Sequence, residues 1–286
     1  MKTFNNKHIL ITGAASGIGR ALAIAFSQYT CTLYITDANN DGLQETAQLC
    51  RSNHATYHPN TTLNVHTYCF KVNQQQEWEN TVKQVLTHTS HLDIVINNAG
   101  IAHQTVTAES VNDALLRNIM DVNFYGMVYG TQACLPLLKN SPEGCLANVS
   151  SLFGLVGIAY QSAYCASKFA IRGYTESLRM EAQAFYPHVN ILTIHPGGVR
   201  TDIANTAVPT HFKSPQELEK DIKKFNKALV LSPSRAAQQV LRGITKQKTR
   251  VLVGSDAKLF DFIARIMPQR YTRLGLYYLK KMNLID

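Results

Sequence analysis

The chain has 286 residues, of which 45% are apolar and 16% charged, and this balance excludes a disordered or low-complexity protein. Its 28 basic and 19 acidic residues give a formal net charge of +9, which favours acidic partners. The basic residues are not gathered with aromatic residues in one stripe, so we expect no nucleic-acid binding.

Short apolar segments alternate with helical segments along the whole chain. We expect strands at residues 8–13, 31–37, 67–72, 92–100, 145–151, 189–198 and 250–254. We expect helices at residues 21–29, 41–51, 77–88, 108–138 and 163–185, and an exposed loop at 51–66. Strands that are apolar along their whole length, with helices between them, are typical of a parallel sheet covered on both faces. The sequence therefore predicts a Rossmann-type, doubly wound α/β fold with a mainly parallel seven-stranded sheet, formed by residues 1–286 as one domain.

Ligands of doubly wound folds bind outside the carboxyl ends of the strands. Six residues of the candidate motifs follow or close a predicted strand: Gly13, Asp37, Val72, Asn97, Ser151 and His195. These residues should therefore meet along one edge of the sheet, although we expect His195 only to end its strand.

The segment ITGAASGIGR places Gly13, Gly17 and Gly19 between the first strand and the first helix. Glycine lets the backbone bend sharply and lets a phosphate approach without a Cβ in the way. The helix that follows offers free N–H groups and the positive end of its dipole to an anion. The alternative is a merely flexible turn, but its position after the first strand favours a pyrophosphate site.

Asp37 ends the second strand, about 20 residues beyond the glycine turn, where an acidic residue accepts hydrogen bonds from the adenosine ribose. A carboxylate there repels a 2′-phosphate. The next residue is Ala38, and Ala15 and Ser16 are not basic either, so the cation expected for NADP is missing. The sequence therefore favours NAD as the cofactor, unless Asp37 merely ends a strand.

Tyr164 and Lys168 are four residues apart in a predicted helix, so both side chains lie on one face and can reach the same point. Alone, this spacing is more typical of a surface pair than of a catalytic one. Ser151 at a strand end and Asn123 in a helix likewise have ordinary structural interpretations. When these residues occur together with the other motifs, the catalytic interpretation is favoured over the structural one.

Six motifs follow one another along the chain: TGAASGIG, NNAG at 97–100, Asn123 in DVNFYG, Ser151 in NVSS, YCASK and HPGGVRTD. Their order resembles that of the classical short-chain dehydrogenase/reductase family. The resemblance covers about residues 5–202. It implies an NAD(P)-dependent enzyme of class EC 1.1.1.-, which transfers a hydride between a nicotinamide cofactor and a secondary alcohol or ketone.

The resemblance also implies roles for individual residues. Tyr164 would act as acid and base, Lys168 would lower its pKa and bind ribose, Ser151 would orient the substrate oxygen, and Asn123 would hold a relay water. The cofactor would be bound by Gly13, Ser16, Gly17, Ile18, Gly19, Asp37, Val72, Asn97, Asn98, Tyr164, Lys168, Pro196, Gly197, Val199 and Thr201. The sequence departs from the family at Lys71, where an Asp near the adenine is usual.

The substrate is less well defined by the sequence. Residues 202–235 form the expected substrate lid, with helix starts at Ser214, supported by Pro215 and Glu217, and at Ser232-Pro233. Five apolar residues after the candidate serine favour an apolar, lipid-like substrate: Leu152, Phe153, Leu155, Val156 and Ile158. The basic, amphipathic tail at 256–286 either packs on its own domain or a dimer partner, or lies on a bilayer surface.

The chain begins without the apolar run of a signal peptide, and its six cysteines include no C-x-x-C pair, so we expect a cytoplasmic protein, with attachment to a membrane surface through its tail as the alternative. His54, His58 and His66 lack the spacing of a metal site and are expected in a solvated loop. We expect a homodimer or homotetramer. The alternatives to an alcohol dehydrogenase are a non-catalytic NAD(H)-binding redox sensor or scaffold, and a reductase of acyl groups on an acidic carrier.

Overall fold

The computed structural model describes residues 1–201 and 231–281. Its strands are all parallel and form one seven-stranded sheet in the order β3-β2-β1-β4-β5-β6-β7. The strands are β1 (His8–Thr12), β2 (Thr32–Asp37), β3 (Asn64–Cys69), β4 (Ile94–Asn97), β5 (Gly144–Val149), β6 (Val189–Pro196) and β7 (Arg250–Val253). The predicted doubly wound fold is thereby confirmed.

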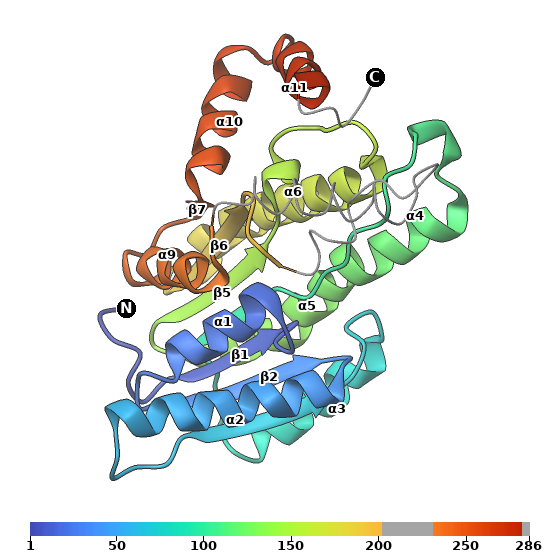
Figure 1. The fold of residues 1–286 in the computed structure, drawn as a ribbon. Coiled ribbons are helices and arrows are strands. Elements are labelled where there is room, and N and C mark those ends of the chain that lie inside the picture. Colours follow the sequence, from blue (N-terminus) through green and yellow to red (C-terminus); the bar gives the residue numbers. More distant parts are fainter. Residues whose placement is uncertain (202–230, 282–286) are drawn as a thin grey trace.

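Helices cover both faces of this sheet (Figure 1). One face is covered by α1 (Gly17–Phe26), α2 (Asn40–Tyr57) and α9 (Pro233–Thr245), and the other by α3 (Gln75–Leu86), α5 (Gly126–Lys139) and α6 (Ser162–Phe185). Successive strand residues face opposite sides, so Ile9 and Ile11 enter the first core and Leu10 the second. Both faces of the strands are therefore apolar, as the sequence pattern requires.

The expected loop at 51–66 is wrong in most of its length. Helix α2 continues to Tyr57, and β3 begins already at Asn64. His54 is buried on the inner side of α2, where its ring nitrogens lie 2.9 Å from the Ser27 carbonyl oxygen and 3.0 Å from Thr61 Oγ1. A histidine thus takes the last buried position of a helix whose earlier buried residues are Leu43, Thr46, Ala47 and Cys50.

The helical stretch expected at 108–138 is interrupted. It consists of a short 3₁₀ turn η1 (Ala108–Ser110), the helix α4 (Asp113–Met120), a π-helical turn η2 (Asp121–Tyr125) and then α5. A π turn inserts one residue into the helical repeat and often marks a functional site. Here it contains Asn123.

The carboxyl-terminal part begins with α9, whose N-cap Ser232 accepts a hydrogen bond from the backbone N–H of Arg235 and is followed by a proline, as predicted. The remaining helices, α10 (Ser255–Ile266) and α11 (Tyr271–Lys281), extend beyond the layers of the sheet and its helices (Figure 1). No helix among residues 1–201 and 231–281 is long and apolar enough to cross a bilayer. The expected lid, apart from 231–235, and the cap formed by Ser214, Pro215 and Glu217 lie outside the described residues.

Candidate active site

The glycine turn after β1 leaves room for an anion at the start of α1. Gly13 and Gly17 have φ angles of +66° and +54°, which other residues rarely adopt. A Cβ on Gly19 would collide with the Gly13 carbonyl oxygen, so the turn and the helix are in direct contact. Ser16 is the exposed N-cap of α1, and its side chain makes no capping hydrogen bond. Free N–H groups and a free hydroxyl therefore remain at the positive end of this helix.

Hydrogen bonds from neighbouring segments hold the glycine turn in place. The Asn98 amide donates to the carbonyl oxygens of Thr12 at 2.9 Å and Gly13 at 3.1 Å, and the Thr12 hydroxyl accepts from the backbone N–H of Asn98 and Ala99. Arg20 on α1 donates to the Ala15 carbonyl oxygen and forms an ion pair with Glu45 on α2. The sequence analysis included Asn98 as a cofactor residue, but it missed Thr12 and Arg20.

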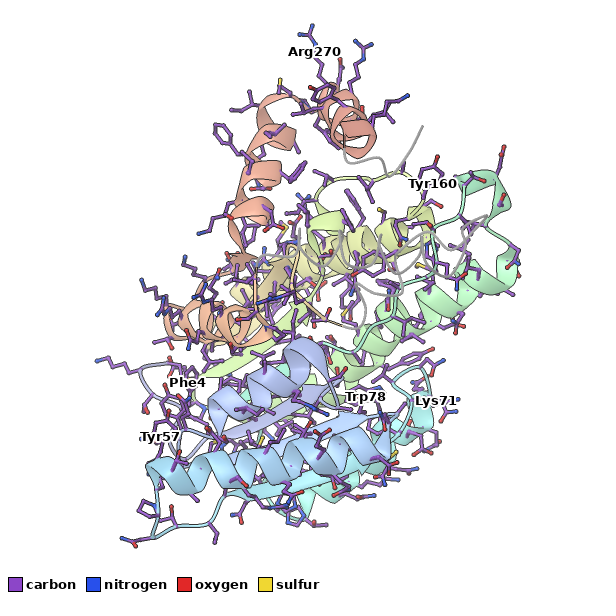
Figure 2. The ribbon with its side chains drawn as sticks, in the orientation of Figure 1. Phe4, Tyr57, Lys71, Trp78, Tyr160 and Arg270 are labelled. Atoms are coloured by element: carbon purple, nitrogen blue, oxygen red, sulfur yellow. The ribbon has the colours of Figure 1, made fainter. Side chains whose placement is uncertain are left out.

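Asp37 lies at the end of β2, directly beside the glycine turn. Its two carboxylate oxygens accept hydrogen bonds from the backbone N–H groups of Ala15 at 3.0 Å and Asn39 at 2.9 Å. Each oxygen keeps a further lone pair for a ribose hydroxyl. Lys71, which replaces the usual Asp of the family, is exposed at the end of the third strand segment (Figure 2).

The Tyr164 phenol and the Lys168 ammonium lie one turn apart on α6, with Nζ 5.6 Å from the centre of the tyrosine ring. Lys168 is only 3% exposed, and its Nζ donates to the Val149 carbonyl oxygen at 3.2 Å. Burial lowers the pKa of Lys168 to about 8 and raises the pKa of Tyr164 to about 12. Burial thus opposes ionisation of the Tyr164 phenol, and the lowering of its pKa by Lys168 in the presence of the cofactor stays a prediction.

Two adjacent serines follow β5, and their contacts differ. The Ser150 hydroxyl is buried and donates to the Lys168 carbonyl oxygen at 2.8 Å. The Ser151 hydroxyl hydrogen-bonds to the Tyr164 phenol, an interaction that partly offsets the rise in the tyrosine pKa. It also accepts from the backbone N–H of Phe153 at 3.1 Å. The structure thus brings Ser151, and not Ser150, to the candidate tyrosine.

Asn123 is completely buried, and both the oxygen and the nitrogen of its side-chain amide are hydrogen-bonded within the protein. The amide oxygen accepts from Ile101 N–H at 2.7 Å, and the amide nitrogen donates to the Ile101 carbonyl oxygen at 2.9 Å and to Ser167 Oγ at 3.0 Å. A Cβ on Gly100 would lie 3.1 Å from Asn123 Oδ1 and 3.2 Å from Lys168 Nζ. Gly100, which sequence reasoning missed, therefore lies close to both candidate residues, where a side chain would be tightly packed.

The segment that follows β6 passes the carboxyl ends of the strands beside the glycine turn. A Cβ on Gly17 would lie 3.1 Å from the Thr201 side chain, which places two predicted cofactor segments against each other. Val199 is buried and pairs with Leu231 in a short parallel bridge. Pro196 ends β6, and a Cβ on Gly197 would collide with the Asp256 carboxylate.

His195, also at the end of β6, faces the candidate serine rather than solvent. Its Nδ1 lies 3.0 Å from the Ser151 carbonyl oxygen, and the ring is buried. Burial lowers the pKa of His195 to about 4, so the ring is neutral at physiological pH and Nδ1–H donates to that carbonyl. His195 therefore does more than end a strand: it fixes the backbone of Ser151.

Two expected cofactor residues have side chains directed elsewhere. The Asn97 amide is 3% exposed and donates to Thr131 Oγ1 and Asn148 Oδ1, which ties β4 to α5 and β5. Val72 is buried in the core with Trp78, whose indole N–H donates to the Val72 carbonyl oxygen. These side chains therefore serve the packing of the protein, and a contact of Asn97 or Val72 with the cofactor through the main chain stays a prediction. Ile18 is half-buried against the first core.

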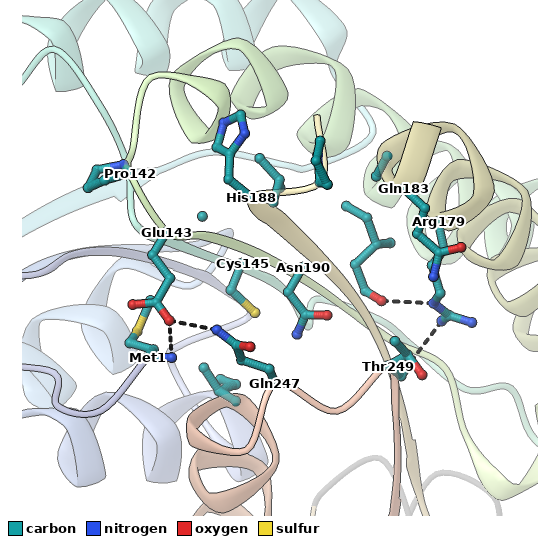
Figure 3. Close-up of a pocket in the computed structure, with 16 residues that line it drawn as sticks. Met1, Pro142, Glu143, Cys145, Arg179, Gln183, His188, Asn190, Gln247 and Thr249 are labelled. Atoms are coloured by element: carbon teal, nitrogen blue, oxygen red, sulfur yellow. Dashed lines mark hydrogen bonds and ion pairs between the residues drawn. The ribbon is translucent and has the colours of Figure 1, made fainter. Parts of the chain in front are cut away.

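A cavity of about 350 Å³ lies away from these residues, at the amino ends of β5 and β6 (Figure 3). Arg179 and Asn190 line it, together with Glu143, which is paired with the Met1 amino group. The Arg179 guanidinium already donates to Thr193 Oγ1 and to the carbonyl oxygens of Ile191 and Thr249. This cavity therefore belongs to the opposite edge of the sheet from the candidate catalytic residues.

Asp256, on the first turn of α10, shapes the segment after β6. Its Oδ2 accepts the backbone N–H of Gly198 at 2.5 Å. We expect Asp256→Ala to lower the free energy of unfolding by about 1–3 kcal/mol, because a partly buried N–H group loses its acceptor. Asp256→Asn, which keeps an acceptor oxygen, should lose less than half of that amount. Urea denaturation of both variants checks this, and an alanine variant as stable as the wild type would contradict it.

Fold and site define a class of protein: a parallel sheet with a glycine turn at its first strand and a Ser-Tyr-Lys group beside it. The family model for short chain dehydrogenases matches residues 7–211. The chain therefore belongs to the short-chain dehydrogenase family, a family of oxidoreductases.

Three relatives illustrate this membership. SadH of Mycobacterium tuberculosis, named as an oxidoreductase, is 38% identical over 276 residues, which cover 96% of this chain and 95% of SadH. Estradiol 17-beta-dehydrogenase 11 of Mus musculus is 28% identical over 275 residues, or 96% of this chain and 84% of that protein. The crystal structure of a short-chain dehydrogenase/reductase from Burkholderia phymatum in complex with NAD shares the fold, with a TM-score of 0.79, 20% identity and coverage of 93% and 96% of the two chains.

Proposed function

We propose that the protein is an NAD-dependent oxidoreductase that interconverts a secondary alcohol and a ketone in an apolar, lipid-like molecule. The observation that carries this proposal is the convergence of Ser151, Tyr164 and Lys168 on one side of β5 and α6. These three groups together can hold a substrate oxygen and move its proton.

The residues at the glycine turn fit NAD. A pyrophosphate can approach Gly13 and Gly17 and accept from the free N–H groups of α1, while the Asp37 carboxylate accepts from the adenosine ribose hydroxyls. Pro196, Gly197, Val199 and Thr201 would line the nicotinamide half, and Lys168 would donate to its ribose. When bound, NAD supplies the hydride acceptor and a positive charge near the phenol.

In this mechanism the substrate hydroxyl lies between Ser151 Oγ and the Tyr164 phenol oxygen. Ser151 orients the oxygen by hydrogen bonding, and Tyr164 takes its proton during oxidation or returns it during reduction. In the protein alone, burial holds the pKa of Tyr164 at about 12, so the phenol stays protonated. The ammonium of Lys168 and a further positive charge in the site would both favour the phenolate.

Asn123 has a positioning role in this proposal. Because its side-chain amide is bonded to Ile101 and Ser167, the relay water expected from the sequence would bind to the main chain of the π turn and not to the amide. Such a water would pass the proton from the lysine side of the site to solvent.

We expect Asp37→Ala to weaken NADH binding about 10- to 100-fold, which corresponds to the loss of hydrogen bonds to a charged group. Asp37→Asn keeps an acceptor for Ala15 N–H but removes the charge, so it should raise the affinity for NADPH relative to NADH. Fluorescence titration with both dinucleotides measures this. The control Asp41→Ala, an exposed carboxylate on α2, should bind like the wild type. Stronger binding of NADPH than NADH by the wild type would contradict the assignment of Asp37.

Two of the five apolar residues that the sequence offered for an apolar substrate still support it. Leu152, Leu155 and Val156 are buried and belong to the protein's own packing. Phe153 and Ile158 stay half-buried, and the Phe153 ring packs edge-on against Tyr164 at 6.3 Å. The name of the relative estradiol 17-beta-dehydrogenase 11 points to a substrate of the same character.

The experiment that tests the proposed function is turnover of NAD with secondary alcohols of increasing chain length, ending with a steroid alcohol. We expect kcat/KM to rise with apolar area, because each additional buried methylene contributes about 0.8 kcal/mol. Binding of NADH without turnover of any alcohol or ketone would favour the non-catalytic alternative. Turnover that is independent of chain length would contradict the lipid-like substrate.

We also propose that the protein is a homodimer or homotetramer. Support comes from α6, on which three large apolar side chains are exposed: Phe169, Met180 and Phe185. Exposed apolar side chains can mark subunit contacts.

A further inference from the structure

The helix α10 carries an apolar stripe on its outer side. Leu259, Phe262 and Ile266 are 55%, 60% and 60% exposed. They occupy positions i, i+3 and i+7, so they lie on one helix face. The opposite side holds the helix on the domain, because Ala257 is buried and Asp261 forms an ion pair with Arg250 of β7.

The charge around this stripe is almost entirely positive. Residues 255–281 contain six basic and two acidic side chains. Both acids are engaged within the protein: Asp256 with Gly198 N–H, and Asp261 with Arg250 and Arg265. Lys258 and Arg273 are exposed, and Arg270 points outward at the bend between α10 and α11 (Figure 2).

We propose that the outer face of α10 and α11, defined by Leu259, Phe262, Ile266 and the surrounding basic residues, docks on an anionic bilayer surface. Apolar side chains would enter the boundary between headgroups and acyl chains, while Lys258, Arg270 and Arg273 would contact lipid phosphates. The net charge of +9 acts in the same direction.

A second copy of the chain fits this face less well than an anionic bilayer does. In a symmetric dimer the same patch faces itself, so the basic residues around the stripe would oppose one another. A stripe of three apolar side chains is also small beside the roughly 800 Å² that each partner contributes to a stable interface. Charge complementarity therefore selects an anionic surface.

The docking face is connected to the candidate active site. α10 packs against the short 3₁₀ turn η3 (Leu152–Gly154), which directly follows Ser151. The Tyr271 hydroxyl at the start of α11 accepts the backbone N–H of Gly157 at 3.3 Å. A docked protein would therefore hold the loop beyond Ser151 close to the bilayer, where a lipid-like substrate is dissolved. This last step rests on the proposed function, whereas the docking itself does not.

The experiment is co-sedimentation of the full chain with vesicles of phosphatidylcholine alone or with about 30% phosphatidylglycerol. We expect binding to the anionic vesicles, weaker binding to the neutral ones, and loss of binding at high salt. The double variant Phe262→Asp/Ile266→Asp should bind at least about tenfold more weakly. The matched control Tyr57→Asp/Leu86→Asp changes two similarly exposed apolar residues at the ends of α2 and α3, which lie far from α10, and should bind like the wild type (Figure 1).

Three results would overturn the proposal: no binding of the wild type to anionic vesicles, equal losses in the variant and its control, or a halved molecular mass of the Phe262→Asp/Ile266→Asp variant in light scattering. The last would mark the face as a contact between copies. Turnover of a short, water-soluble alcohol separates this proposal from the proposed function. The docking variant should keep that turnover, while a protein without dehydrogenase activity would still bind the vesicles.

Discussion

Tyr164→Phe is expected to lower kcat by about 10²- to 10⁴-fold, because the phenol oxygen is the group that takes the substrate proton. The change removes one hydroxyl and keeps the ring that packs against Phe153, so the Kd for NADH should stay within about twofold. Steady-state turnover and fluorescence titration of the same preparation measure the two quantities.

The control for this variant is Tyr160→Phe, which removes the hydroxyl of an exposed tyrosine four residues earlier in the chain. It should keep wild-type kcat and NADH affinity. If Tyr164→Phe also keeps wild-type turnover, the proposed acid and base role of Tyr164 is wrong. If it loses turnover and NADH affinity together, the variant has disturbed the site and the Ser151 hydrogen bond becomes the next position to test.

Lys168→Met is expected to abolish turnover and at the same time to stabilise the protein at neutral pH. The pKa of Lys168 falls from its usual 10.5 to about 8 on folding, because the ammonium is buried and has no carboxylate partner among residues 1–201 and 231–281. A difference of this size corresponds to about 3 kcal/mol of destabilisation by the charged form. Methionine removes the charge but also leaves the Val149 carbonyl oxygen without its donor, so we expect a net gain of about 1–3 kcal/mol at pH 7.

The stability gained by Lys168→Met should depend on pH in a defined direction. Below pH 8 the lysine is charged in both the folded and the unfolded state, and the folded protein bears the whole penalty. Between pH 8 and 10.5 the folded state releases its proton first, so the wild type becomes more stable relative to the variant. Tyr164 is present in both proteins, so the raised pKa of its phenol acts equally on each and largely cancels in the difference.

Urea denaturation at pH 7 and at pH 10 measures both effects. The exposed residue Lys246 provides a control, and Lys246→Met should change the free energy of unfolding by less than about 0.5 kcal/mol at either pH. A Lys168→Met variant that is less stable than the wild type at pH 7, or whose stability difference does not change with pH, would contradict the burial of an unpaired ammonium.

Much of the fold could be predicted because local patterns determine it. The strands are apolar on both faces, and Gly13 and Gly17 adopt positive φ angles in the turn after β1. The end of α2 could not be predicted, since His54 becomes a core residue only through the Ser27 carbonyl of another helix. Such a partner is 27 residues distant in sequence and leaves no local signal.

The candidate site likewise has a part that the sequence predicts and a part that it does not. Spacing within one helix was sufficient to place Tyr164 and Lys168 together, and the order of motifs selected Ser151. Contacts from distant segments were not predictable: Asp256 reaches Gly198 across 58 residues, and the Asn123 amide is used by a loop 22 residues earlier. The pKa values of the tyrosine and the lysine depend on burial, which a sequence pattern does not reveal.

The contacts of Asn98 and Thr12 have a kinetic consequence. They tie the glycine turn after β1 to β4, its neighbour in the sheet, so the backbone that receives the pyrophosphate is already ordered before any dinucleotide arrives. Binding then involves no disorder-to-order transition of this turn, and little conformational entropy is lost there. The association rate at this end of the cofactor is set by diffusion and orientation, and affinity differences among dinucleotides appear mainly in how long each one stays bound.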